Sequence, residues 1–149
     1  MKPLKIRIIA FLSLALCAAS AYAADIEIKM LDKSETEGTL AFEPSFVKAN
    51  VNDTLVFIPT SKGHNSYSLL VPAGAQPWKS EFDHEFRVKL EKEGVYLYAC
   101  TSHIRMGMAG VVQVGKADNL EEARKKVTEE SAKMALNKDR FTKAFDQVQ

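Results

Sequence analysis

The nine residues CTSHIRMGM, at positions 100–108, combine side chains that bind soft metal ions. Cys100 and His103 follow the apolar run VYLYA. A thiolate with an imidazole suits copper or zinc, whereas the thioethers of Met106 and Met108 favour cuprous copper. A thiolate, two imidazoles and a long axial methionine form the blue-copper electron-transfer arrangement. The stretch therefore predicts a copper site that needs one more histidine.

Two other histidines could complete this site. His64 stands in SKGHNSYSL, directly after Gly63, where a strand is expected to begin. His84 stands in FDHEFRV between charged residues, which is typical of an exposed surface. Because loops at one end of a β-sandwich cluster in space, His64 can meet the loop that carries Cys100. We expect His64, and not His84, to be the second imidazole.

Three other functions use the same residues differently. Cys100 could be an enzyme nucleophile with His103 or His64 as its base, but that leaves the methionines unexplained. A copper carrier or storage protein would bind Cu(I) through exposed methionines and would show no reversible colour. An adhesion module with a spare buried cysteine would bind no metal.

The first 23 residues have the pattern of a secretory signal peptide. Lys2, Lys5 and Arg7 precede an apolar run over residues 8–19, and small residues follow at 21–23. The run is shorter than the roughly 20 residues that span a bilayer. We expect cleavage after residue 23 and export of the remaining chain.

Composition limits what the exported chain can do. Removing 23 residues from 149 leaves 126, which fits one domain over residues 24–149. The leader carries three of the 20 basic residues and none of the 19 acidic ones, so 17 basic and 19 acidic residues leave a net charge of −2. This balance gives no support to nucleic-acid binding. One cysteine, Cys100, remains, and an unpaired thiol outside the cytoplasm suggests a buried or metal-bound sulfur.

Residues 24–115 have the pattern of an all-β sandwich or barrel. Ile26, Ile28 and Met30 alternate with polar residues, as in a half-buried strand. Short apolar runs separated by turn residues follow, and they predict antiparallel strands. These runs are residues 45–49, 54–59, 65–71, 85–90, 94–100 and 110–115.

Residues 116–149 change to a helical period. Asp118 or Asn119 is the expected N-cap of a first helix, and a second is expected near residues 139–147. Their apolar positions are Leu120, Ala123, Val127, Met134, Leu136, Phe141, Ala144 and Phe145. This apolar surface is too small for a separate domain, so the helices should pack on one face or edge of the sandwich.

The sequence resembles the pseudoazurins, a family of type I copper proteins with the cupredoxin fold. The stretch MLDKSETEGTLAFEPSFVKANVNDTLVFIPTSKGHN, residues 30–65, follows that family's early sequence. The family's later loop reads Cys-Thr-Pro-His and then Met-Gly-Met, close to the CTSHIRMGM of this chain. The family also has two C-terminal helices. The resemblance covers residues 24–149 and implies a Greek-key β-sandwich with two C-terminal α-helices.

The resemblance also implies a ligand set for one type I copper ion. That set is His64, Cys100, His103 and Met108. Asn65 would brace the two ligand loops and lie near the thiolate. Pseudoazurins take their axial methionine eight residues after the cysteine, at Met108, whereas amicyanins take it six residues after, at Met106. The Met-Gly-Met ending favours Met108 and leaves an amicyanin-type carrier as the alternative.

The chain departs from the family at two positions. Ser102 replaces a usual proline and adds a backbone N–H, which we expect to favour Cu(I) and raise the reduction potential. Ala99 stands where pseudoazurins often have lysine, so Lys33, Lys62 and Lys79 are the candidates for a basic docking ring.

The resemblance implies a periplasmic electron carrier that is not an enzyme, and the lack of a long apolar surface stretch in the sequence predicts a monomer. Its implied partners are redox proteins, with copper nitrite reductase or another periplasmic reductase as acceptor and a cytochrome as donor.

Overall fold

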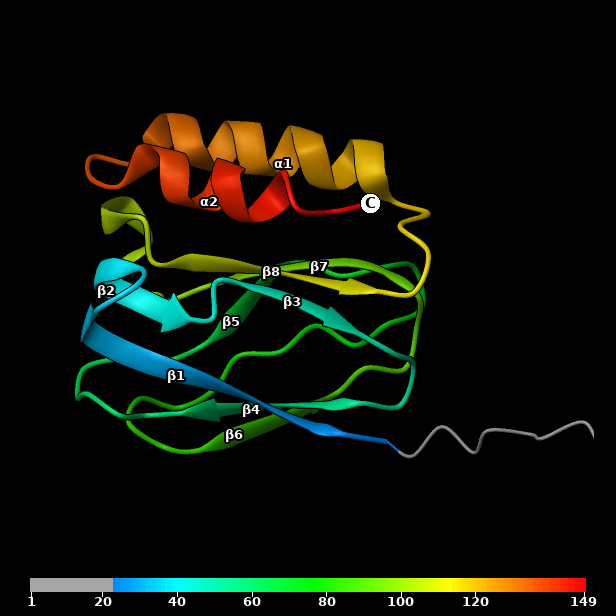
Figure 1. The fold of residues 1–149 in the computed structure, drawn as a ribbon, viewed down its shortest axis with the longest axis horizontal. Coiled ribbons are helices and arrows are strands. Elements are labelled where there is room, and N and C mark those ends of the chain that lie inside the picture. Colours follow the sequence, from blue (N-terminus) through cyan, green and yellow to red (C-terminus); the bar gives the residue numbers. More distant parts are fainter. Residues whose placement is uncertain (1–22) are drawn as a thin grey trace, which may run out of the picture.

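The structure, a computed structural model, describes residues 23–149 as two four-stranded sheets with two helices packed on one of them (Figure 1). The expected leader lies almost entirely outside the described residues. The strands are β1 (Asp25–Ser34), β2 (Gly38–Glu43), β3 (Phe46–Ala49), β4 (Thr54–Ile58), β5 (Tyr67–Leu70), β6 (Phe86–Lys89), β7 (Gly94–Ala99) and β8 (Ala109–Val114). The all-β sandwich expected from the sequence is confirmed.

The two sheets have the strand orders β2-β1-β4-β6 and β3-β8-β7-β5. The expectation of purely antiparallel strands is wrong, because β1 pairs in parallel with β4, and β3 with β8. The chain crosses to the second sheet after β2 and returns to the first sheet after β3. Strand β4 is therefore added beside β1 and runs in the same direction. The short apolar runs also miss β2, whose Leu40 has a positive φ of 50° that interrupts the regular strand.

Strand β7 is buried on both faces and separates two cores. Tyr96, Tyr98 and the adjacent Cys100 face the core between the sheets. Val95, Leu97 and Ala99 face the core under the helices. Because side chains alternate along a strand, this register directs the thiol of Cys100 into the inter-sheet core at the end of β7.

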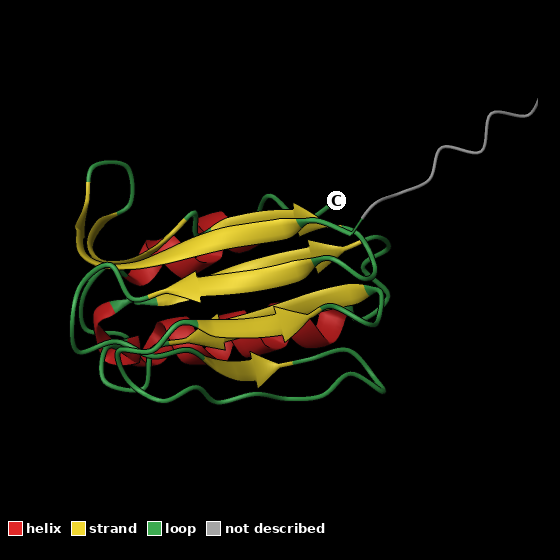
Figure 2. Ribbon diagram, turned by 90° about the horizontal axis from the view of Figure 1, so that it is seen from below, coloured by secondary structure: helices red, strands yellow, loops and turns green. Residues whose placement is uncertain are grey.

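The helices α1 (Leu120–Lys133) and α2 (Lys138–Phe145) cover the sheet that contains β7 and β8, as Figure 1 shows. In the view of Figure 2 both helices lie behind the strands. Their buried side chains are Ala123, Val127, Phe141, Ala144 and Phe145, and Met134 is buried just after α1. The predicted packing on one sheet face is therefore confirmed. Leu136 is the exception, because it is 56% exposed. None of the described helices is long and apolar enough to span a bilayer.

Asn119 is the N-cap residue of α1, but its amide does not cap the helix. Instead its Oδ1 accepts a hydrogen bond from Val95 N–H at 2.7 Å, and its Nδ2 donates to the Val95 carbonyl at 2.9 Å. This pair of bonds fixes the start of α1 to the start of β7.

Candidate metal centre

Two loops at one end of the sandwich bring three donor atoms together. His64 lies between β4 and β5, and Cys100 and His103 lie in the loop that joins β7 to β8. The Sγ of Cys100 is 3.5 Å from Nδ1 of His103 and 4.0 Å from Nδ1 of His64, and the two Nδ1 atoms are 3.1 Å apart. The sequence predicted this meeting of residues 36 positions apart.

The donor set fits a single soft metal ion. Ligands that bind one ion at about 2.0–2.3 Å lie roughly 3–4 Å from one another. The three donor atoms here have that spacing, and all lie within 4.8 Å of one another. Thiolate sulfur with two imidazole nitrogens is the equatorial set of a blue-copper site. His84 is not part of the group, since its side chain is exposed and its Nδ1 donates to the Phe82 carbonyl.

Asp32 determines which nitrogen of His64 faces the metal centre. Its Oδ1 lies 2.9 Å from Nε2 of the fully buried His64, so this nitrogen carries the proton and donates it. The lone pair of Nδ1 is then directed towards Cys100, as metal binding requires. The sequence did not predict this role for Asp32, which lies on β1 and has no local pattern that marks it.

His103 is half-buried, and its Nδ1 faces the same point. Its pKa is lowered, first by burial and then by the neighbouring His64, although Asp32 acts in the opposite direction. The imidazole is therefore neutral over a wider pH range, which is the form that binds metals.

The two methionines of the loop have different environments. Met108 is fully buried and packs in the core that also contains Cys100, whereas Met106 is 38% exposed. Backbone bonds close the loop around Met108: its carbonyl accepts from Cys100 N–H at 3.1 Å, and its N–H donates to the His103 carbonyl at 3.2 Å. Gly107 permits this turn with a φ of 82°.

Asn65 joins the two ligand loops. Its Oδ1 accepts from Thr101 N–H at 2.9 Å, while its Nδ2 donates to Thr101 Oγ1 and to the Ser80 carbonyl. The amide thus braces the residue next to Cys100, as expected. A second brace, from Asp83, was not expected: its Oδ1 accepts from the N–H groups of Gly63 and His64.

Comparisons with known proteins agree with this geometry. Residues 28–115 match the family described as copper binding proteins of the plastocyanin/azurin family. Pseudoazurin from Paracoccus pantotrophus is 40% identical over 110 residues, which cover 72% of this chain and 75% of that protein.

Two solved structures extend the match over most of the described residues. Native pseudoazurin from Hyphomicrobium denitrificans is 34% identical, with a TM-score of 0.70 over 84% of this chain and 98% of that one. Pseudoazurin from Methylobacterium extorquens AM1 is 35% identical, with a TM-score of 0.71 over 84% of this chain and 99% of that one. The chain therefore belongs to the plastocyanin/azurin family of copper-binding proteins, within which it is a pseudoazurin, a blue-copper electron carrier and not an enzyme.

Proposed function

We propose that copper is bound by His64, Cys100, His103 and Met108. The observation that carries this assignment is the convergence of the Cys100 sulfur and two Nδ1 atoms within 4.8 Å of one another. The complete burial of Met108 beside Cys100 supports a thioether from this residue as the axial ligand.

The chain supplies rigidity around this site. When bound, copper supplies one-electron exchange between Cu(II) and Cu(I). The braces from Asn65 and Asp83 hold the two ligand loops in one arrangement, so little rearrangement accompanies the change of charge. His103 is the ligand that is not fully buried, and its Nε2 has no hydrogen-bond partner among residues 23–149. We infer that electrons enter and leave through this ring edge.

The axial assignment is tested by two matched substitutions. Met108→Gln should change the visible spectrum and the reduction potential of the copper-loaded protein, because the axial ligand tunes both. Met106→Gln, two residues away in the same loop, should leave both unchanged. The reverse result would favour the amicyanin-type arrangement and would exclude Met108.

We infer that residues 1–23 direct the chain to the periplasm and are removed, leaving a single domain over residues 24–149. The basic start, the apolar run and the small residues at 21–23 support this processing. Mass spectrometry of protein released from the periplasm should give an N-terminus at Ala24. An intact leader, or protein retained in the cytoplasm, would contradict the inference.

We propose that the carrier docks as a monomer, with its exposed lysines, on an acidic redox partner. Lys33 follows Asp32, and Lys62 precedes the Gly63–His64 pair. Lys79 forms an isolated antiparallel β-bridge with Tyr67, which in turn pairs with Ala99 at the end of β7. All three lysines are exposed, and these neighbours connect each of them to His64 or to Cys100. Charges of this kind raise the association rate more than the affinity.

Copper nitrite reductase is the proposed acceptor and a cytochrome the proposed donor. Stopped-flow mixing of reduced carrier with nitrite reductase should give a rate that falls as salt rises. Lys62→Glu should lower the low-salt rate, whereas Lys125→Glu, on the exposed face of α1, should not. Equal low-salt rates in Lys62→Glu and Lys125→Glu would contradict docking through Lys33, Lys62 and Lys79. A salt-independent or undetectable transfer would exclude this acceptor.

A further inference from the structure

The connection between α1 and α2 binds the end of the copper loop. The 3₁₀ turn η1 (Ile104–Met106) and Gly107 lead from His103 to Met108. The carbonyls of three consecutive residues each accept a hydrogen bond from the helical segment. The bonds are Ala135 N–H to Arg105 at 2.7 Å, Asn137 Nδ2 to Met106 at 2.9 Å and Arg140 Nη1 to Gly107 at 3.2 Å. In Figure 1, η1 is the unlabelled yellow-green coil below the α1–α2 connection.

The same connection packs closely on Gly107. A Cβ atom at this position would come within 2.8 Å of Asn137 Cβ and within 2.9 Å of the Leu136 carbonyl. Glycine is needed here for the positive φ, but glycine also has the widest range of backbone conformations. A loop that pivots at Gly107 therefore needs contacts from outside to hold Met108 in one orientation.

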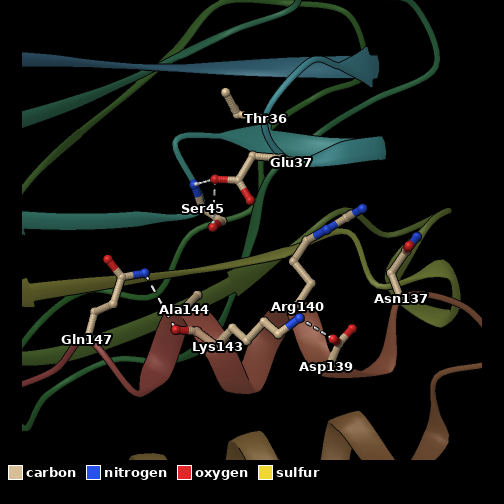
Figure 3. A pocket seen from close by; sticks show the side chains of 9 residues that line it. All are labelled: Thr36, Glu37, Ser45, Asn137, Asp139, Arg140, Lys143, Ala144 and Gln147. Atoms are coloured by element: carbon tan, nitrogen blue, oxygen red, sulfur yellow. Dashed lines mark hydrogen bonds and ion pairs between the residues drawn. The ribbon is translucent and has the colours of Figure 1, made fainter.

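Arg140 supplies the charged donor among these contacts. Its side chain rises from α2 towards β2, beside the polar cavity of about 280 Å³ drawn in Figure 3. Arg140 is 7% exposed, and its guanidinium donates to the carbonyls of Thr39 and Leu40 as well as to that of Gly107. It has no carboxylate within 4.0 Å among residues 23–149. Burial lowers its pKa, although Glu37 opposes this effect.

We propose that Arg140 is a positioning residue of the copper site, which holds the Gly107 carbonyl against β2 and so fixes the loop segment that carries Met108. Asn137 completes the brace through the Met106 carbonyl. The proposal rests on Met108 as the axial ligand. A neutral side chain here would leave three carbonyls without this donor and so lower stability, which is why the test needs readouts at the copper site that stability alone does not change.

Arg124 provides the matched control. Its guanidinium lies 5.2 Å from the centre of the Phe145 ring and so packs α1 against α2, but it does not contact the copper loop. Arg140→Met and Arg124→Met remove the same charge from the same helical pair. Asn137→Gly removes the amide that binds Met106 and keeps the positive φ of 47° accessible, so it tests the brace if Arg140→Met fails to fold.

The first measurement is hydrogen exchange of the Gly107 and Met108 amides in the metal-free protein. Loss of a hydrogen bond to a charged group predicts exchange about tenfold faster in Arg140→Met. Asn137→Gly should change exchange in the same direction, and Arg124→Met should match the wild type. In the copper-loaded protein, Arg140→Met should also shift the visible spectrum and the reduction potential, and Arg140→Lys, which keeps the charge and one donor nitrogen, should restore part of the shift.

Wild-type exchange in both Arg140→Met and Asn137→Gly would overturn the proposal, as would equal changes in Arg124→Met. Faster exchange with an unchanged spectrum and potential would limit Arg140 to loop stability and overturn its role in the copper site. The Met108→Gln protein then shows whether the ligand assignment has failed as well, because only that failure leaves its spectrum unchanged.

Discussion

His64 and Asp32 form a 2.9 Å hydrogen bond although 32 residues separate them in the chain. Asp32 lies on β1, and His64 follows β4, the parallel neighbour of β1. The imidazole is fully buried while the carboxylate is 67% exposed. The exposed carboxylate of Asp32 is thus hydrogen-bonded to Nε2 of His64, the ring nitrogen that faces away from the proposed copper ion.

Asp32→Asn should raise the reduction potential and keep the visible colour. Asparagine still offers an oxygen to His64 Nε2–H, but the negative charge that favours Cu(II) over Cu(I) is lost. Asp32→Ala should also weaken copper binding by about 10–100-fold. Spectroelectrochemical titration measures the first effect and competition with a chelator the second. The exposed Asp118→Asn, two residues before α1, is the control, and a shift as large in this control would contradict the prediction.

Tyr98→Phe should stabilise the protein. The Tyr98 hydroxyl is fully buried and has no hydrogen-bond partner among residues 23–149. Removing it should raise the free energy of unfolding by about 1 kcal/mol, because an unsatisfied buried hydroxyl is costly. The Tyr96 hydroxyl donates to the Lys92 carbonyl at 2.8 Å, so Tyr96→Phe should lower the free energy of unfolding by about 1 kcal/mol. Urea denaturation of the metal-free variants distinguishes the two, and destabilisation of both would contradict the prediction.

Ser102→Pro should lower the reduction potential. Ser102 is exposed and adds a backbone N–H beside the Cys100–His103 pair, where the family usually has a proline without that donor. An additional donor near a thiolate favours Cu(I), so its removal favours Cu(II). Voltammetry on the copper-loaded variant tests this, with Ser102→Ala as a control that keeps the N–H. An unchanged potential in Ser102→Pro would show that the donor has no effect.

Asp53 should stabilise the processed chain at neutral pH but not in acid. Its carboxylate accepts from the backbone nitrogens of Ala24 at 2.8 Å and Asn50 at 2.7 Å, and these bonds lower its pKa. Cleavage before Ala24 would turn the first donor into an ammonium group and strengthen the pair.

Because the folded-state pKa of Asp53 lies below the unfolded value of about 3.9, its contribution is complete above that value and is lost as the pH falls through the folded pKa. Asp53→Asn should therefore unfold at lower urea concentration at pH 7, and its difference from the wild type should shrink below about pH 4. The exposed Asp146→Asn is the control. A difference that stays constant with pH would contradict the prediction.

The sequence could predict the parts of the metal centre that depend on local pattern. The alternation along residues 94–100 directs Cys100 into the core, and the clustering of loops at one sandwich end brings His64 to it. The helical period of residues 120–145 likewise predicts packing on the sheet.

Other features depend on distant partners that no local pattern marks. The strand β2 contains Leu40 in a left-handed conformation, and the Leu40 carbonyl is bound by Arg140, 100 residues later. The bond between Asp32 and His64 depends on the parallel pairing of β1 with β4, which the sequence did not predict. The residues proposed to bind copper could therefore be predicted from local periodicity. The residues that hold these ligands in place depend on contacts between distant parts of the chain.

The most direct test of the account is to titrate the metal-free protein with Cu(II) and follow its visible absorption. The account predicts an intense colour that saturates at one copper per chain, bleaches with a mild reductant, returns on reoxidation and is lost in Cys100→Ser. A colourless copper complex, or a colour that survives in Cys100→Ser, would contradict a copper–thiolate electron-transfer site.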